Sequence, residues 1–464
     1  MKRLTSNFLS IIGSDVARRV LGFFTIAYLA RIITTADFGA INIGYTILSY
    51  ALMISSGGLN TFGAREVARS VSMEFVNSML SLRFVAALLV YGIVSLVTIS
   101  CIPSTDLASL VMVFCLSLFA HAVLLDWFFQ GKEEMGIVGI GRFASAAVYL
   151  VLIVVFVRSS SALKLVAVAA VVGDVVATII LLLFYSKRNR GVRFHFSSSG
   201  WKLFLAQAFP LGTGSMLAHF SVNLPPLVIG IFLTNADVGI YSAASKMVFF
   251  LLMFDRVLAT LLLPASARLH AYSPEALSST LNAALRWILI VALPLSVGGT
   301  LLAERLITVV FGAQYQLSAI VFQVLIWYFF FTMIHTIYTS GIVVVGKERE
   351  YSRVMIISAI IYGISVIVCT KLFGVIGGAA AVVGSEAITL ILMRRSFHES
   401  AKTVLPKSLP LLLLAAVIMG VVLMVLPSMH LILSVLVGAG VYAIVLMGTR
   451  AVTIADVLAL VRRA

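Results

Sequence analysis

Long apolar segments alternate with short polar ones along almost the whole chain. Most of the apolar segments run for about 20 residues, the length that an α-helix needs to cross the hydrocarbon core of a bilayer. The pattern predicts about fourteen such helices, at 8–33, 39–61, 84–102, 107–129, 137–157, 165–185, 207–233, 239–262, 287–303, 318–341, 354–370, 375–393, 408–427 and 430–449. The expected fold class is therefore all-α and integral to a membrane.

Composition supports this fold class and excludes a soluble one. Hydrophobic residues make up 61% of the 464 residues and charged residues 11%, and the mean hydropathy is +1.12. Soluble domains have about 45–50% and about 25% of these residues. The net charge of +15 would suggest nucleic acid as the partner of a soluble protein. In a membrane protein it indicates basic cytoplasmic loops instead.

The basic residues also predict the orientation of the chain. With a cytoplasmic N-terminus, 24 of the 33 lysines and arginines fall in cytoplasmic segments and five at the outer side. The positive-inside rule then places both termini in the cytoplasm and requires an even number of spans. Charged residues interrupt the first apolar segment, so we expect a retained helix rather than a signal peptide. The three cysteines, Cys101, Cys115 and Cys369, show no spacing typical of a disulfide or a metal site.

Three short motifs occur twice, in the same order, at offsets of 200, 215 and 211 residues. The pairs are Thr34-Thr35-Ala36-Asp37-Phe38-Gly39 with Thr234-Asn235-Ala236-Asp237-Val238-Gly239, Gly131-Lys132-Glu133 with Gly346-Lys347-Glu348, and Ala169-Ala170-Val171-Val172-Gly173 with Ala380-Ala381-Val382-Val383-Gly384. Six helices per copy give both copies the same orientation, so they are predicted to be parallel repeats. The predicted domains are an N-lobe at 1–190, a cytoplasmic linker at 191–202, a C-lobe at 203–396, and two further helices with a cytoplasmic tail at 397–464.

The repeated motifs have a structural interpretation. In Thr-x-Ala-Asp-x-Gly, the Thr or Asp oxygen can cap the following helix, and Gly39 and Gly239 would permit a tight chain reversal. Direct contact with a substrate is the alternative interpretation. In Gly-Lys-Glu, the glycine would end a helix and the lysine would face the cytoplasm.

Charged residues inside the predicted spans are the candidate functional residues, because charge in a membrane usually faces a wet interior or a partner. Asp15 can pair with only one of Arg18 and Arg19, which leaves positive charge in the first helix. The predicted substrate site is a cationic cavity that suits phosphate, formed by Arg18, Arg19, Arg31, Lys246 and Arg256. Structural ion pairs are the alternative for these residues.

Acidic residues and one histidine could couple transport to an ion gradient. The candidates for coupling or for ion pairs are Asp15, His219, Asp255, Asp174 and Glu386. His219 lies one helical turn from Asn223 and could carry a proton, although a histidine that is only hydrogen-bonded is the alternative. Prolines such as Pro210, Pro225 and Pro226 are expected to bend helices of the second half. The sequence contains no metal-ligand cluster or catalytic motif, so we expect no resident cofactor and no enzymatic activity.

Several motifs resemble a known family of exporters. They are Leu29-Ala30-Arg31 with Ala36-Asp37-Phe38-Gly39, Phe129-Gln130-Gly131-Lys132-Glu133, and Val310-Phe311-Gly312-Ala313-Gln314-Tyr315. Together with the helix count, they resemble the polysaccharide branch of the multidrug/oligosaccharidyl-lipid/polysaccharide exporter superfamily, and within it the Wzx-type flippases. The chain departs from the pattern in its second half, where Ile231 stands opposite Arg31.

The resemblance implies a V-shaped bundle of two six-helix lobes, with helices one, two, seven and eight lining the cavity. The implied cargo is an undecaprenyl-diphosphate-linked oligosaccharide, moved to the periplasmic leaflet of the bacterial inner membrane for O-antigen or capsule assembly. A polysaccharide polymerase and chain-length proteins are the implied partners, and a proton or sodium gradient could drive the cycle. The alternatives are a drug or small-molecule exporter of the same fold, and a membrane glycosyltransferase or polymerase.

Overall fold

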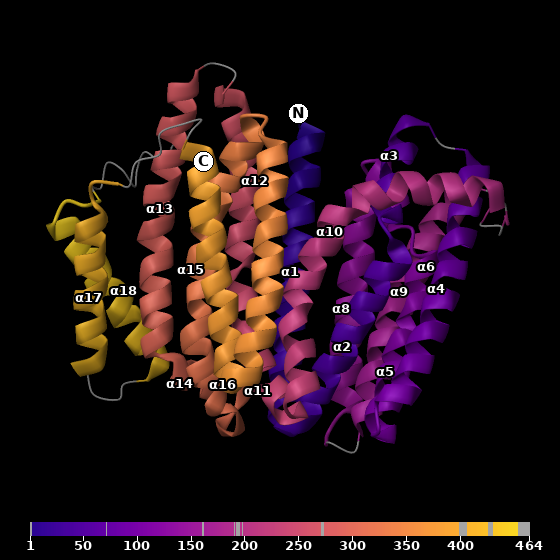
Figure 1. Cartoon of the computed structure of the whole chain (residues 1–464), viewed down its shortest axis with the longest axis horizontal. Helices are drawn as coiled ribbons and strands as arrows, with labels where there is room; N and C mark the ends of the chain where they lie inside the picture. Colours follow the sequence, from indigo (N-terminus) through magenta and orange to yellow (C-terminus); the bar gives the residue numbers. More distant parts are fainter. Residues whose placement is uncertain are drawn as a thin grey trace. The chain divides into compact units, whose positions relative to one another are not determined.

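We describe a computed structural model of the chain (Figure 1). The structure describes residues 2–70, 72–159, 162–189, 191, 195–196, 198–270, 273–398, 406–425 and 430–452, and side chains from residue 17 onward in the first helix. The regular elements of these residues are all helical. The structure therefore confirms the predicted all-α class.

The chain forms two compact units, Met1–Ser242 and Ala243–Ala464. The helices of the first unit are α1 (Lys2–Ile32), α2 (Thr35–Ser56), α3 (Leu59–Arg69), α4 (Met73–Cys101), α5 (Thr105–Cys115), α6 (Ser117–Val123), α7 (Asp126–Gly131), α8 (Met135–Phe156), α9 (Leu163–Arg188), α10 (Ser198–Phe232) and the beginning of α11 (Asn235–Leu251). Within this unit α1 packs on α8, α8 on α9, and α2 on α4, α5 and α10. These two units are defined by contacts within the chain and not by the repeat. The domain boundaries that the repeat predicts therefore stay a prediction.

The second unit contains the rest of α11 and the remaining helices. These are α12 (Met253–His270), α13 (Pro274–Leu301), α14 (Ala303–Phe311), a 3-10 turn η2 (Ala313–Tyr315), α15 (Leu317–Val344), α16 (Glu348–His398), α17 (Leu409–Val425) and α18 (Leu431–Gly448). α15 packs against α12, α13 and α16. Figure 1 shows α17 and α18 side by side, with α17 against α13.

Ten helices of the described residues are long and apolar enough to cross a membrane, or eleven if the bent α10 counts as one span. One of them, α16, is 51 residues long and contains a break at Gly374, whose φ of 64° and ψ of −151° are not helical. The predicted spans 354–370 and 375–393 lie on the two sides of this break. The chain is thus a multi-span membrane protein.

The exposed faces of these helices are also typical of a membrane protein. On α4, the side chains of Leu89, Ile93 and Leu96 are 62%, 62% and 68% exposed. Apolar side chains this exposed would be costly in water, but they suit contact with lipid tails. The interior of the first unit instead contains an aromatic cluster around Trp127 and Phe129, which is packed with residues of α3, α4 and α9.

The repeated Thr-x-Ala-Asp-x-Gly motif caps a helix in both copies, as predicted. Thr34 Oγ1 accepts a hydrogen bond from the Asp37 backbone N–H at 3.2 Å and donates one to the Asp37 carboxylate at 2.6 Å. Thr234 and Asp237 make the same two bonds at the same distances. Each pair satisfies backbone donors that have no partner inside the helix.

The glycines of this motif have a different role from the predicted chain reversal. Gly39 and Gly239 lie inside α2 and α11, where their helices cross backbone to backbone. A Cβ on Gly39 would overlap the Asn235 carbonyl, and a Cβ on Gly239 would overlap the Thr35 carbonyl. Each copy of the motif therefore supplies the glycine that makes room for the other copy. The two copies of the repeated motif are therefore in direct contact, and each makes the equivalent approach to the other.

The two Gly-Lys-Glu copies also differ from the prediction in part. Gly346 adopts the left-handed conformation after α15, with a φ of 76°, as expected for a helix-ending glycine. In the first copy Glu133 takes that conformation, with a φ of 58°, while Gly131 is still helical. A Cβ on Gly131 would lie 2.5 Å from the Ala64 carbonyl, so this glycine allows α7 to approach α3.

The close approach of α2 and α11 at Gly39 and Gly239 makes protein stability sensitive to a single added methyl group at either position. Gly39→Ala or Gly239→Ala should destabilise the protein by about 1–3 kcal/mol, because the added carbon overlaps backbone that cannot rotate away. The midpoint of thermal unfolding in detergent measures this. Gly92 of α4 is the matched control, because a Cβ at that position would have no atom within 4 Å. Gly92→Ala should leave the midpoint unchanged or raise it, and equal midpoints for all three variants would contradict the crossing.

Candidate functional site

A polar cavity of about 350 Å³ lies inside the first unit. Helices α2, α3, α4, α6 and α10 contribute its walls. The lining residues are Ser49, Leu52, Met53, Ser55, Ser56, Gly58, Asn60, Thr61, Arg83, His121, Ala122, Met216 and His219. The three residues of this set that can carry charge are Arg83, His121 and His219, and all three are basic. None of the described residues that line the cavity is acidic.

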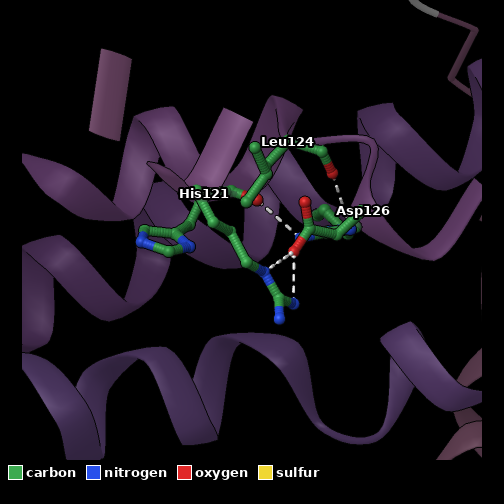
Figure 2. A network of polar contacts seen from close by, with 5 residues as sticks. His121, Leu124 and Asp126 are labelled. Carbon is green, nitrogen blue, oxygen red and sulfur yellow. Dashed lines mark hydrogen bonds and ion pairs between the residues drawn. The ribbon is translucent and has the colours of Figure 1, made fainter. Parts of the chain in front are cut away.

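Arg83 is 6% exposed and is held by the end of α6. Its guanidinium donates to the His121 carbonyl at 2.5 Å and to the Leu124 carbonyl at 3.3 Å. These carbonyls belong to the last turn of a helix, where they have no helical partner and where the helix dipole favours a cation. Asp126, which accepts two hydrogen bonds from Arg142, is close enough to act electrostatically on Arg83. Figure 2 shows this network around His121, Leu124 and Asp126.

His121 pairs with one of the predicted acidic residues. Its Nε2 lies 3.4 Å from Asp174 Oδ2 on α9. Thr178, one turn further along α9, donates to the Ala120 carbonyl at 3.0 Å and so joins the same two helices. The sequence analysis selected Asp174, but it did not identify His121 as its partner.

α10 also lines the cavity and is bent. The segments Gly200–Gly214 and His219–Phe232 meet at 71°. Pro210 on one side and Pro225-Pro226 on the other lie inside this helix. Each proline removes a backbone donor and crowds the preceding turn. The bend expected in the second half occurs in this helix, although its break at 214–219 lies between the prolines and not in a turn that any of them crowds. It places Met216 and His219 at the cavity.

Direct hydrogen bonds join α10 to α2 along the cavity. Asn223 Nδ2 donates to Ser49 Oγ at 3.1 Å and to the His219 carbonyl at 2.9 Å. The Tyr50 hydroxyl donates to the Phe220 carbonyl at 3.1 Å. At one end of this seam, Gly58 and Gly212 meet so closely that a Cβ on Gly212 would lie 2.5 Å from Gly58 Cα. His219 and Asn223 thus share one environment, as their spacing predicted.

The second unit contains a separate cluster of polar groups among apolar helices. The Thr336 hydroxyl donates to Asp255 Oδ1 at 2.5 Å. Glu386 accepts a hydrogen bond from Thr332 at 3.2 Å, and His335 Nδ1 lies 2.9 Å from the same carboxylate. The sequence analysis selected both acids and missed His335. The spacing of Thr332, His335 and Thr336, which puts them on one face of an apolar helix, is the signal that could have identified them.

The predicted basic residues do not line the described cavity. Arg18 and Arg19 are partly buried in α1, and Arg31 is exposed in its last turn, where a cation suits the helix dipole. Lys246 is partly buried in α11 and Arg256 is exposed on α12. The side chain of Asp15, the predicted ion-pair partner of Arg18 or Arg19, lies outside the described residues. The substrate-binding role of this set stays a prediction.

Arg83 is the basic residue that sequence reasoning misplaced. The predicted span 84–102 leaves Arg83 just outside the membrane, among the basic residues of a cytoplasmic segment. The structure begins α4 at Met73 and buries Arg83 within it. A hydropathy pattern cannot anticipate this, since the carbonyls that hold Arg83 lie about forty residues further along the chain.

Comparison with known proteins agrees with the architecture. The chain belongs to the polysaccharide biosynthesis protein family, which it matches over residues 4–270, more than half of its length. A relative from Shigella dysenteriae, provisionally named an O-antigen transporter, is 23% identical over 406 residues, 85% of this chain and 100% of the relative.

Solved structures share the fold at low sequence identity. A structure of the lipid II flippase MurJ in an inward closed conformation covers 94% of this chain and 98% of its own, with a TM-score of 0.73 and 14% identity. An inward-facing multidrug transporter of the MATE family and the MOP superfamily covers 86% and 97%, with a TM-score of 0.61 and 13% identity. The chain therefore has the MurJ- and MATE-like fold.

The anchoring of Arg83 makes a quantitative prediction. Arg83→Gln should lower the free energy of unfolding by about 1.5–3 kcal/mol, because charge-assisted hydrogen bonds to buried carbonyls are lost. Arg83→Lys should recover part of the loss, since it keeps the charge but not the planar fork. Chemical or thermal unfolding in detergent measures both variants.

Arg69→Gln is the matched control for this prediction. Arg69 is 67% exposed and pairs with Glu66 at 3.6 Å on the surface of α3. Its substitution should cost less than about 1 kcal/mol, as is usual for exposed ion pairs. An Arg83→Gln protein as stable as the control would contradict the anchoring role.

Proposed function

We propose that this protein is a flippase that moves undecaprenyl-diphosphate-linked oligosaccharide repeat units from the cytoplasmic to the periplasmic leaflet of a bacterial inner membrane. The observation that carries the proposal is the basic, hydroxyl-rich cavity within a membrane-spanning fold. Membership of the polysaccharide biosynthesis family and the name of the Shigella relative support it. The translocated repeat units would be assembled into O-antigen, capsule or a related surface polysaccharide.

The chemistry of such a cargo matches the chemistry of the cavity. A diphosphate is anionic and a sugar head is hydrated, whereas the prenyl tail is apolar. Arginine and histidine suit phosphate oxygens, and hydroxyl and amide groups suit sugar hydroxyls. The cavity presents both kinds of group, from Arg83 and the two histidines to Ser49, Ser55, Ser56, Asn60 and Thr61. The tail would remain in lipid against the exposed apolar helix faces.

The finer features predicted from sequence belong to this proposal. We propose fourteen spans, with both termini in the cytoplasm and α16 contributing two of them on either side of Gly374. Arg18, Arg19, Arg31, Lys246 and Arg256 are proposed to form a further part of the diphosphate path. A polysaccharide polymerase and chain-length proteins are the proposed partners.

A drug exporter of the same fold is the competing function. Exporters of cationic drugs need acidic cavities, and the lining of the described cavity favours an anion. The competing function therefore predicts changed drug sensitivity on deletion, and the flippase predicts stalled glycan export.

Deletion of the gene should stop surface polysaccharide display without stopping synthesis of its repeat units. Lipid-linked repeat units should accumulate on the cytoplasmic leaflet, because assembly continues while translocation does not. Extraction of lipid-linked glycan and surface staining measure the two quantities, and the intact gene supplied in trans is the control. Normal surface polysaccharide in a strain without a second homologous gene would refute the flippase.

Charge reversal in the first helix should abolish transport. Losing a charge-assisted phosphate contact at Arg18 should weaken binding by about 1.5–3 kcal/mol, roughly 10- to 150-fold. Arg18→Glu should fail to restore polysaccharide display at a normal protein level, and Arg18→Lys should restore it in part. Arg158→Glu, at an exposed position after α8, is the control. Normal transport by Arg18→Glu would remove Arg18 from the proposed path.

A further inference from the structure

The two limbs of α16 fold back on each other. The break at Gly374 separates a first limb from a second, and the hydroxyls of Ser365 and Ser385, 20 residues apart in sequence, lie 2.8 Å from each other. In a continuous helix residues at this separation would be about 30 Å apart, so the limbs are antiparallel. Equal steps from this contact lead to the same level, which places Arg353 of the first limb level with Phe397 of the second.

Four arginines lie at this end of the two limbs. Arg349 and Arg353 belong to the first limb, and Arg394 and Arg395 belong to the second. All four are exposed, and none of them makes a hydrogen bond or an ion pair with another described residue. Guanidinium groups that the described chain leaves without partners are available to bind an anion from outside the protein.

The two arginines of the first limb line an open groove of about 530 Å³ on an exposed face of α16. The polar part of the groove contains these arginines, one hydroxyl and one carboxylate. The apolar part contains two isoleucines, which are 55% and 42% exposed. The groove thus joins a cationic end to an apolar end within about three helical turns. Its lining residues are Glu348, Arg349, Ser352, Arg353, Ile356 and Ile357.

Exposed apolar residues continue from the apolar end of the groove along the same limb. Ile356, Ile360 and Ile364 are exposed at intervals of four residues, on one side of the helix. Phe373 is exposed at the end of the limb, 20 residues after Arg353. About 20 helical residues span about 30 Å, the thickness of the hydrocarbon core. Arg353 therefore lies at the headgroup level of one leaflet, which is the cytoplasmic leaflet in the predicted orientation.

A phospholipid fits this groove better than other anions do. Its acyl chains can stay in the bilayer against the exposed isoleucines while its phosphate meets the guanidinium groups. A soluble anion or an acidic protein segment would use only the polar end. The lipid-linked cargo would need several groups for its sugars, but Ser352 is the one hydroxyl among the residues that line the groove, whereas the cavity of the first unit has several.

We propose that this groove binds the headgroup of an anionic phospholipid of the cytoplasmic leaflet, with Arg349 and Arg353 at its phosphate and Arg394 and Arg395 adding attraction from the second limb. The inference goes beyond the proposed flippase function and does not depend on it. One basic residue near an anionic membrane surface strengthens binding about fivefold, the equivalent of about 1 kcal/mol. Two arginines together should therefore strengthen it about 30-fold.

Lipid binding can be measured on the full chain in the absence of cargo. The protein is purified in a neutral detergent and titrated with phosphatidylglycerol, and native mass spectrometry measures the fraction of protein that retains a lipid. Phosphatidylcholine is the comparison, because its own cation balances its phosphate. The wild type should bind phosphatidylglycerol about tenfold more tightly than phosphatidylcholine, or more.

Charge variants test the residues of the groove. Arg353→Gln should bind phosphatidylglycerol about fivefold more weakly, and Arg349→Gln combined with Arg353→Gln about 30-fold more weakly. The corresponding double lysine variant keeps both charges and should stay within about fivefold of the wild type. Glu348→Gln removes the carboxylate of the groove and should bind about fivefold more tightly. Arg69→Gln is the matched control, because exposed Arg69 pairs with Glu66 on α3, and it should bind as the wild type does.

Competition identifies the source of the anion. Glycerophosphoglycerol, the same headgroup without acyl chains, should not displace phosphatidylglycerol at an equal concentration, and displacement would show an anion site that needs no lipid. Undecaprenyl diphosphate should compete no better than phosphatidylglycerol does. If it displaced phosphatidylglycerol at a far lower concentration, the groove would belong to the cargo path and the proposal would be wrong.

The remaining outcomes separate lipid binding from folding and from transport. Equal binding of the two phospholipids, or equal binding by Arg353→Gln and Arg69→Gln, would overturn the proposal. The midpoint of thermal unfolding without lipid should be the same in every variant, because the substituted residues are exposed. A lower midpoint and equally weak binding in the glutamine and lysine double variants would assign these arginines to folding instead. Phosphatidylglycerol binding by a protein that moves no cargo would refute the flippase alone.

Discussion

Polar groups within the spans must find their partners inside the chain, because lipid tails offer none. This constraint explains the positions of two charged residues in particular. Arg83 is held by the carbonyls at the end of α6, and Glu386 by His335 and Thr332. Such contacts fix which helices are neighbours more strictly than apolar packing does, since apolar faces can pack against either protein or lipid.

The duplication of the chain appears in the structure as two kinds of correspondence. The Thr–Asp caps make the same hydrogen bonds, and the glycines of the same motif make room for each other. Other features have diverged. The described basic cavity belongs to the first unit, and the Asp255–Thr336 contact belongs to the second. The shared features are those that build and cap helices in both halves. The features that differ suit a cargo whose sugar, diphosphate and prenyl parts are chemically unlike one another.

Sequence patterns predicted the all-α class, most of the apolar helices and the caps at Thr34 and Thr234. They also singled out Asp174, Asp255, Glu386 and His219 as polar residues within spans. These features follow from local rules, namely the length of an apolar segment, the capping oxygen and the cost of charge in lipid. The sequence therefore determined that these polar residues lie within apolar helices, and at which positions along them.

Tertiary structure alone decided what these residues meet. The carbonyls of α6 that hold Arg83, the pairing of His335 with Glu386, and the crossing of Gly39 with the Asn235 carbonyl all join segments distant in sequence. A water-soluble helix reveals its inner face by a stripe of apolar residues. A helix in lipid is apolar on every side, so its sequence does not distinguish the face that packs from the face that meets lipid. Only the packed fold makes that distinction.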